Sequence, residues 1–117
     1  MKFFMKTNPE NGGLSGPPPP ELMEEMGRFV EEGFRNGTLV ATGALDPRTT
    51  RIEKRGGKIT VTDGPFTEAK EAVIGWAIVE VNSKDEAIEL SKRFWQLVGD
   101  GSGTIQRVYD PQEVPQQ

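Results

Sequence analysis

The longest nearly continuous apolar run in the chain is AVIGWAIVEV, from Ala72 to Val81. Its β-branched and aromatic residues favour a strand, and apolar side chains at successive positions need cover on both faces of a sheet. The run therefore predicts a central strand. Gly75 within it predicts a bulge, a close approach of another backbone, or space for a ring or a ligand beside Trp76.

Strand and helix signals alternate along the rest of the chain. In chain order they predict a strand at 2–7, an irregular Gly- and Pro-rich loop at 8–20, a helix at 21–36, a strand at 38–45, a hairpin at 49–62, the central strand, a helix from residue 83, a strand at 104–109 and a flexible tail at 110–117. The length suits one domain, residues 1–117.

Both predicted helices have an apolar stripe at helical spacing. In the first helix the stripe, expected to face the core, is Leu22, Met23, Met26, Phe29, Val30 and Phe34. In the second, Ser83 and Glu86 have the spacing of a capping box, in which each side chain accepts the other's free backbone N–H.

The predicted hairpin has a definite register if Gly56 and Gly57 are its two turn residues. Arg51 then lies opposite Thr62, and Asp63 lies opposite Thr50. Because side chains alternate along a strand, one face carries Ile52, Ile59, Val61 and Asp63. We therefore expect Asp63 to emerge where a buried face ends.

Without the hairpin, the order of elements is the βαββαβ pattern of an α+β, ferredoxin-like fold. Its split connections place the first and third core strands, near residues 2–6 and 73–81, at the centre of the sheet. Helices on one face leave the other face open, and a second copy of the chain is the simplest cover. We therefore expect a homodimer.

Charge and composition exclude several classes of function. The net charge of -4 and the absence of His make nucleic acid an improbable partner. The absence of Cys removes disulfides, thiolate nucleophiles and thiolate metal sites. No stretch has the length of a membrane span or of a signal-peptide core, so we expect a cytoplasmic protein with no membrane partner. We expect no metal and no cofactor.

The segment VTDGPFTEAKE, residues 61–71, is the candidate site. Asp63 is a candidate catalytic base or hydrogen-bond acceptor in a dimer cleft. The competing interpretation is structural: Asp63 fixes a turn by accepting backbone N–H bonds, Gly64 supplies unusual dihedral angles beside Pro65, and Phe66 fills the core.

Four other residues are candidate ligand contacts. Thr50 and Arg51 suit an anionic group, which Lys70 could also contact, and Trp76 could form an aromatic wall. Each has an ordinary alternative. Arg51 could pair with Glu53, Lys70 could lie in a solvated turn, and Trp76 could belong to the core or to a dimer interface.

Several segments resemble the YCII-related superfamily, in particular the branch named for its DGPF motif. They are GTLVATGAL at 37–45, TTRI at 49–52, GGKITVTDGPFTEAKE at 56–71, GWAIVEVNSKDEAIE at 75–89 and IQRVY at 105–109. The resemblance implies a ferredoxin-like subunit that dimerises through its sheet, as dimeric α/β-barrel proteins do, with a cleft near the motif. The family's reaction is generally unassigned. For some relatives in the wider superfamily a His and an Asp are the proposed acid/base dyad, which this chain cannot form because it has no His.

Two functions from different classes remain open. One is binding of an unknown small molecule, with or without metal-free acid/base catalysis, in a cleft near the DGPF motif. The other is a non-catalytic regulatory or protein-interaction module. The second follows partly from the resemblance, because genes of this family often neighbour those of sigma factors.

Overall fold

The computed structural model describes residues 1–8, 20–46, 48–64 and 74–115. Its elements are β1 (Lys2–Thr7), α1 (Pro20–Arg35), β2 (Leu39–Leu45), β3 (Thr50–Arg55), β4 (Lys58–Asp63), β5 (Ile74–Glu80), α2 (Lys84–Trp95), β6 (Gly103–Val108) and the short 3₁₀ helix η2 (Pro111–Glu113). Most of the predicted loop at 8–20 lies outside the described residues.

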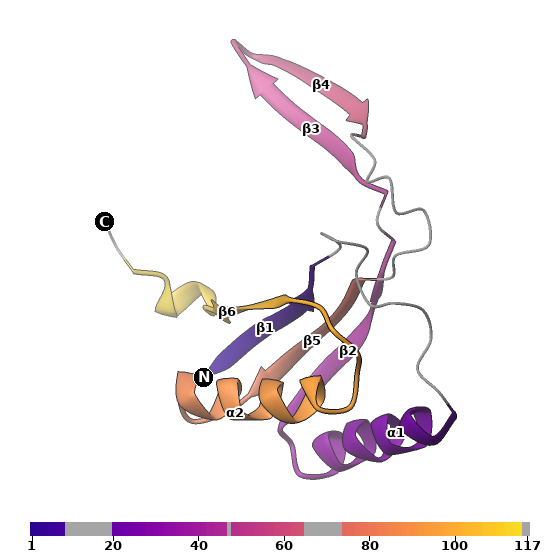
Figure 1. The fold of residues 1–117 in the computed structure, drawn as a ribbon. Helices are drawn as coiled ribbons and strands as arrows, with labels where there is room; N and C mark the ends of the chain where they lie inside the picture. The colour runs from indigo at the N-terminus through magenta and orange to yellow at the C-terminus, as the bar shows by residue number, and fades with distance from the viewer. Residues whose placement is uncertain (9–19, 47, 65–73, 116–117) are drawn as a thin grey trace.

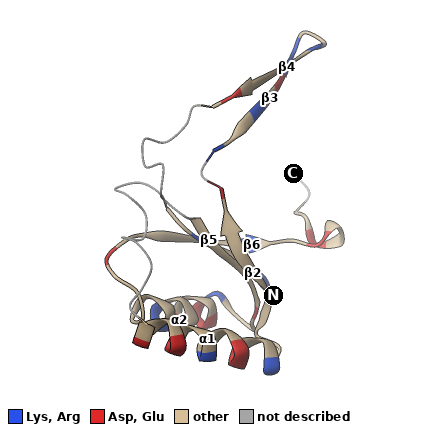
Figure 2. Ribbon diagram, turned by 90° about the vertical axis from the view of Figure 1, so that its right-hand side faces the viewer, with Lys and Arg blue, Asp and Glu red and all other residues tan. Residues whose placement is uncertain are grey.

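Four strands form one antiparallel sheet in the order β2-β5-β1-β6. The first and third core strands, β1 and β5, occupy its centre, as predicted. Both helices lie on one side of this sheet (Figures 1 and 2). The architecture is α+β and is compatible with a ferredoxin-like fold.

The core is centred on β1, β5 and α2. Phe3 and Val79 are opposite each other in the register of β1 and β5, and Ala87 of α2 packs against them. These three side chains are 3%, 2% and 0% exposed. Alternation along the strands therefore turns Phe3, Val79 and their same-face neighbours toward the helices, and Phe4 and Trp76 toward the open face.

The apolar stripe of α1 differs from its expected place in the core. No residue of α1 is fully buried, and Met23 and Phe34 are exposed. Met26, Phe29 and Val30 are half-buried. Helical spacing predicted correctly which face of the helix is apolar, but in this structure that face is only partly buried.

The hairpin has the predicted register. Arg55 pairs with Lys58 around Gly56 and Gly57, and Thr50 pairs with Asp63. Strands β3 and β4 pair only with each other and project away from the four-stranded sheet (Figure 1). The expectation that the hairpin has a buried face is wrong within one chain, because its apolar side chains, Ile52, Ile59 and Val61, are 69%, 64% and 65% exposed.

Trp76 lies on the open face of the sheet, where its ring stacks on Phe4 with 6.2 Å between centroids. The glycine that makes room for this ring is Gly43 on the neighbouring strand, where an added Cβ would lie 3.0 Å from the indole. At Gly75 a Cβ would meet only Thr7, at 3.9 Å. The irregular register predicted at Gly75 is found in β2 instead, between Leu39 and Ala41.

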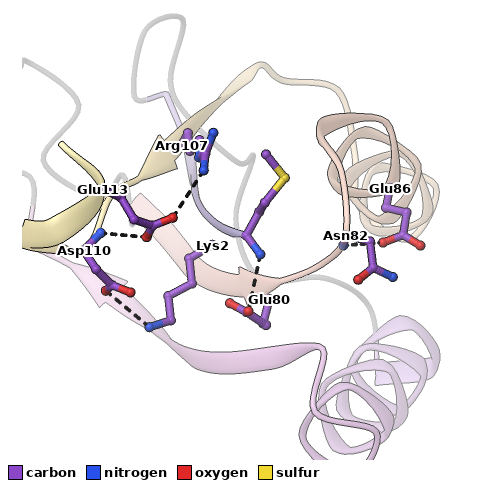
Figure 3. Close-up of polar contacts among 8 residues, drawn as sticks. Lys2, Glu80, Asn82, Glu86, Arg107, Asp110 and Glu113 are labelled. Atoms are coloured by element: carbon purple, nitrogen blue, oxygen red, sulfur yellow. Dashed lines mark hydrogen bonds and ion pairs between the residues drawn. The ribbon is translucent and has the colours of Figure 1, made fainter. Parts of the chain in front are cut away.

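Polar contacts hold both ends of the chain at one end of the sheet (Figure 3). The N-terminal amine lies 3.3 Å from Glu80, and Lys2 lies 3.6 Å from Asp110. Arg107 reaches Glu113 of η2 at 3.4 Å. The contacts involve η2 at the start of the predicted tail, and the expected fraying of residues 110–117 stays a prediction.

The cap of α2 is a variant of the predicted capping box. The Ser83 hydroxyl accepts the Glu86 N–H at 3.2 Å, as expected. The Glu86 carboxylate accepts the backbone N–H of Asn82 at 2.6 Å, one residue before the predicted donor (Figure 3). Two free donors at the helix start are thus satisfied.

The two glycines should respond differently to a methyl group. Gly43→Ala should lower the free energy of unfolding by about 1–3 kcal/mol, because the stacked Trp76 and Phe4 rings restrict the adjustment that the new Cβ requires. Gly75→Ala, with only ordinary van der Waals contact, should be neutral or stabilising. Urea denaturation of both variants measures the difference, and a larger loss at Gly75 would contradict this assignment.

Candidate functional site

The root of the β3–β4 hairpin holds the polar pair that the sequence singled out. Asp63 is the last residue of β4 and Thr50 the first of β3, and the hairpin register places them opposite each other. The Thr50 hydroxyl donates a hydrogen bond of 3.0 Å to the Asp63 carboxylate. Both residues are exposed.

The residue after Asp63 has an unusual backbone conformation. Gly64 is buried and has a φ of 103°, which residues with a side chain rarely adopt. Its N–H donates to the Thr49 carbonyl at 2.8 Å, which closes the root of the hairpin. Three further residues named from the motif, Pro65, Phe66 and Lys70, lie outside the described residues.

Arg51 does not converge with Asp63 within the chain. Its guanidinium lies 2.6 Å from the Glu53 carboxylate, which Arg55 also approaches at 3.5 Å. This pairing with Glu53 is the ordinary alternative considered for Arg51. Alternation in β3 and β4 puts the Arg51 and Asp63 side chains on opposite faces of the hairpin, so an anion held by both would need another arrangement.

Trp76 belongs to a second location, the open face of the four-stranded sheet. It is half-buried there, beside Phe4 and across from Gly43. The hairpin extends away from this sheet (Figure 1), so the candidate residues form two groups within one chain. Asp63 and Thr50 form one group, and Trp76 with its aromatic neighbour forms the other.

The structure adds an ion pair that the sequence interpretation missed, between Asp46 and Arg48, where β2 leads into the hairpin. The Arg48 guanidinium is 2.7 Å from the Asp46 carboxylate, which also accepts the Arg48 backbone N–H at 2.8 Å. These hydrogen bonds, the side-chain one first, lower the pKa of Asp46 from 3.8 to about 2. The same side-chain bond raises the pKa of Arg48. An Asp followed two residues later by Arg was the available signal.

Figure 2 shows how charge is distributed along the hairpin, with basic residues at the tip and an acidic residue at the end of β4. Lys54, Arg55 and Lys58 surround the turn at Gly56 and Gly57.

Among the residues that the structure describes, no group of three acidic side chains is arranged to hold a metal ion. No helix in this part of the chain is long and apolar enough to cross a bilayer.

Comparison with known proteins identifies the family. The sequence profile of the YCII-related domain matches residues 1–110. The chain belongs to the YCII-related domain family. An uncharacterised protein of Rhizobium meliloti (strain 1021) is 27% identical over 99 residues, which cover 80% of each chain. Neither comparison assigns an activity to this YCII-related domain.

The titration of Asp46 should depend on Arg48. Its carboxyl should titrate near pH 2 in the wild type, and in Arg48→Gln its pKa should rise toward 3.8 because both the side-chain donor and the positive charge are lost. Because the folded-state pKa is the lower one, the pair stabilises the fold above the unfolded pKa, and this contribution is lost as pH falls toward about 2. NMR of the carboxyl carbon measures the pKa, and Arg28→Gln, away from this pair, is the matched control.

Replacing the Asp63 carboxylate should leave the fold nearly unchanged. In Asp63→Asn the amide oxygen can still accept the Thr50 hydroxyl, and the position is exposed, so the free energy of unfolding should change by less than about 0.5 kcal/mol. Gly64→Ala is the positive control, with an expected loss of about 1–3 kcal/mol from the strained φ. If Asp63→Asn lost as much as the control, Asp63 would be a structural clamp and no longer the candidate base.

Proposed function

We propose that this YCII-related domain is a cytoplasmic, homodimeric protein that binds a small molecule in a cleft beside Asp63. The observation that carries the proposal is the position of the Asp63 carboxylate. It is exposed, held by a single hydroxyl among the described residues, and placed where the apolar face of the hairpin ends. A carboxylate that has no ion-pair partner among the described residues is suited to accept a hydrogen bond from a ligand.

Two uncovered apolar surfaces support the homodimer. One is the face of the hairpin formed by Ile52, Ile59 and Val61. The other is the open side of the sheet, where Phe4 and Trp76 stack. A symmetric pair of chains would remove both surfaces from water at once, and it would bring the hairpin of one chain toward the sheet of its partner. This arrangement is of the dimeric α/β-barrel type.

In such a dimer the two groups of candidate residues would form one cleft. Trp76 of one chain would provide an apolar wall, and the Asp63 and Thr50 pair of the other chain would provide the polar end. The proposed contacts for an anionic group are Arg51 and Lys70. Arg51 would exchange its ion pair with Glu53 for one with the ligand. In a catalytic form of the proposal, the Asp63 carboxylate would act as the general base.

A matched pair of hairpin variants tests the dimer and the cleft together. Ile59→Asp places a charge on the apolar face, whereas Thr60→Asp places it on the opposite face one residue later. Light scattering should show a monomer for Ile59→Asp and a dimer for Thr60→Asp. A wild-type monomer, or equal dimerisation of both variants, would contradict this interface.

The ligand is sought by thermal-shift screening of small organic acids and their neutral analogues against the wild type. A compound that binds the cleft should raise the melting temperature of the wild type and of Thr60→Asp, but not of Asp63→Asn or Ile59→Asp. If the dimer forms and a saturating screen gives no compound with this pattern, the small-molecule proposal is overturned.

The exposed hairpin also favours the second candidate, a protein-interaction module. Its tip concentrates Lys54, Arg55 and Lys58 next to the apolar face, a combination that suits an acidic protein surface. The two candidates differ in one readout. An interaction module keeps a stoichiometric protein partner in Asp63→Asn and loses it when Arg55 and Lys58 are both changed to Glu.

A further inference from the structure

A cavity of about 350 Å³ is lined by residues of α1, α2 and the sheet. Its floor includes Met5, Ala77 and Val79 of the central strands, and its helical walls include Phe29 of α1 and Leu90 of α2. Protein interiors rarely leave voids much larger than one water molecule. A space of this size is instead within the range of small-molecule pockets.

Helix α1 forms one wall of the cavity without being fully buried. No residue of this helix is fully buried, although Met26, Phe29 and Val30 turn a half-buried apolar surface toward the space. On the sheet, the hydroxyl of the buried Thr7 already accepts the Gly75 N–H at 2.9 Å. Water gains little among such walls, so the body of a ligand that fills the space should be apolar.

Two cationic residues line the cavity, Lys6 of β1 and Arg93 of α2. Arg93 of α2 lies over the Phe29 ring of α1, with 5.4 Å from the guanidinium carbon to the ring centroid. It lines the cavity, and within the described residues no ion pair engages it. Its guanidinium donors remain able to bind a carboxylate in bidentate geometry. Glu32 also lines the cavity and would oppose a bound anion.

We propose that this cavity binds an amphiphilic carboxylate, such as a medium-chain fatty acid, with its chain between α1, α2 and the sheet and its carboxylate on Arg93. This site lies on the helix side of the sheet. The Asp63 and Thr50 pair lies on the hairpin, which extends away from this sheet (Figure 1), so binding in the cavity does not depend on Asp63. Trp76, the proposed apolar wall of the dimer cleft, also borders this cavity. Removal of the Arg93 charge should therefore weaken binding of the carboxylate, and removal of the Glu32 charge should strengthen it.

Isothermal titration of decanoate and decanol into the full chain tests the proposal. Wild type should bind one decanoate per chain, and Arg93→Gln should weaken decanoate by about tenfold while leaving decanol unchanged. Glu32→Gln should tighten decanoate and leave decanol unchanged. Arg28→Gln, on α1 but outside the lining, is the matched charge control. Decanoate affinity that is equal in wild type and Arg93→Gln would overturn the proposal, as would no binding to folded wild type.

A cavity-filling variant locates the ligand. Ala77→Leu adds volume to the floor of the cavity and should abolish binding of both compounds, whereas Ala41→Leu adds the same volume on the open face and should not. Circular dichroism establishes that each variant is folded, and if Ala77→Leu is unfolded, the exposed Arg93→Gln decides alone. Asp63→Asn should bind decanoate as wild type does, which separates this site from the dimer cleft.

Discussion

The pairing of β1 with β5 is the interaction on which the rest of the structure depends. It places Phe3 opposite Val79, and together with Ala87 these two residues form the fully buried apolar core of the described chain. The same pairing decides which side of every other strand faces the helices, because neighbouring strands inherit the register and side chains alternate. Helix α2 is anchored to this centre, while β2 and β6 extend it on either side.

Away from this centre, the chain presents three apolar surfaces that it does not fully cover. The hairpin exposes Ile52, Ile59 and Val61, the open side of the sheet leaves its aromatic pair half-buried, and the apolar stripe of α1 borders a cavity. Exposed apolar patches of this kind usually meet a partner or a ligand. In the two proposals above, a second copy of the chain would cover the first two surfaces, and a small amphiphile would occupy the third. The YCII-related domain thus has a small buried centre with partly uncovered apolar surfaces around it.

Local sequence signals were accurate where the interaction is local. The turn at Gly56 and Gly57 defined the hairpin register because a two-residue turn leaves one possible pairing. Thr50 and Asp63 therefore met as expected, although the face that carries Asp63 is exposed. The space for the Trp76 ring comes from Gly43 on a neighbouring strand, whereas Gly75, the glycine singled out from the sequence, lines the cavity. Which residue lies opposite Trp76 depends on the register of β2. That register shifts between Leu39 and Ala41, and no local sequence pattern indicates the shift.

The sequence by itself determined the order of elements, the centre of the sheet and the pairing within the hairpin, since apolar periodicity and turn chemistry act over a few residues. It also excluded a His-based dyad, because the chain has no His. Only the tertiary structure decided that Arg51 pairs with Glu53, that Asp46 pairs with Arg48, and that no residue of α1 is fully buried. Side-chain pairing depends on directions set by the strands, and helix packing depends on contacts between residues that are far apart in the chain.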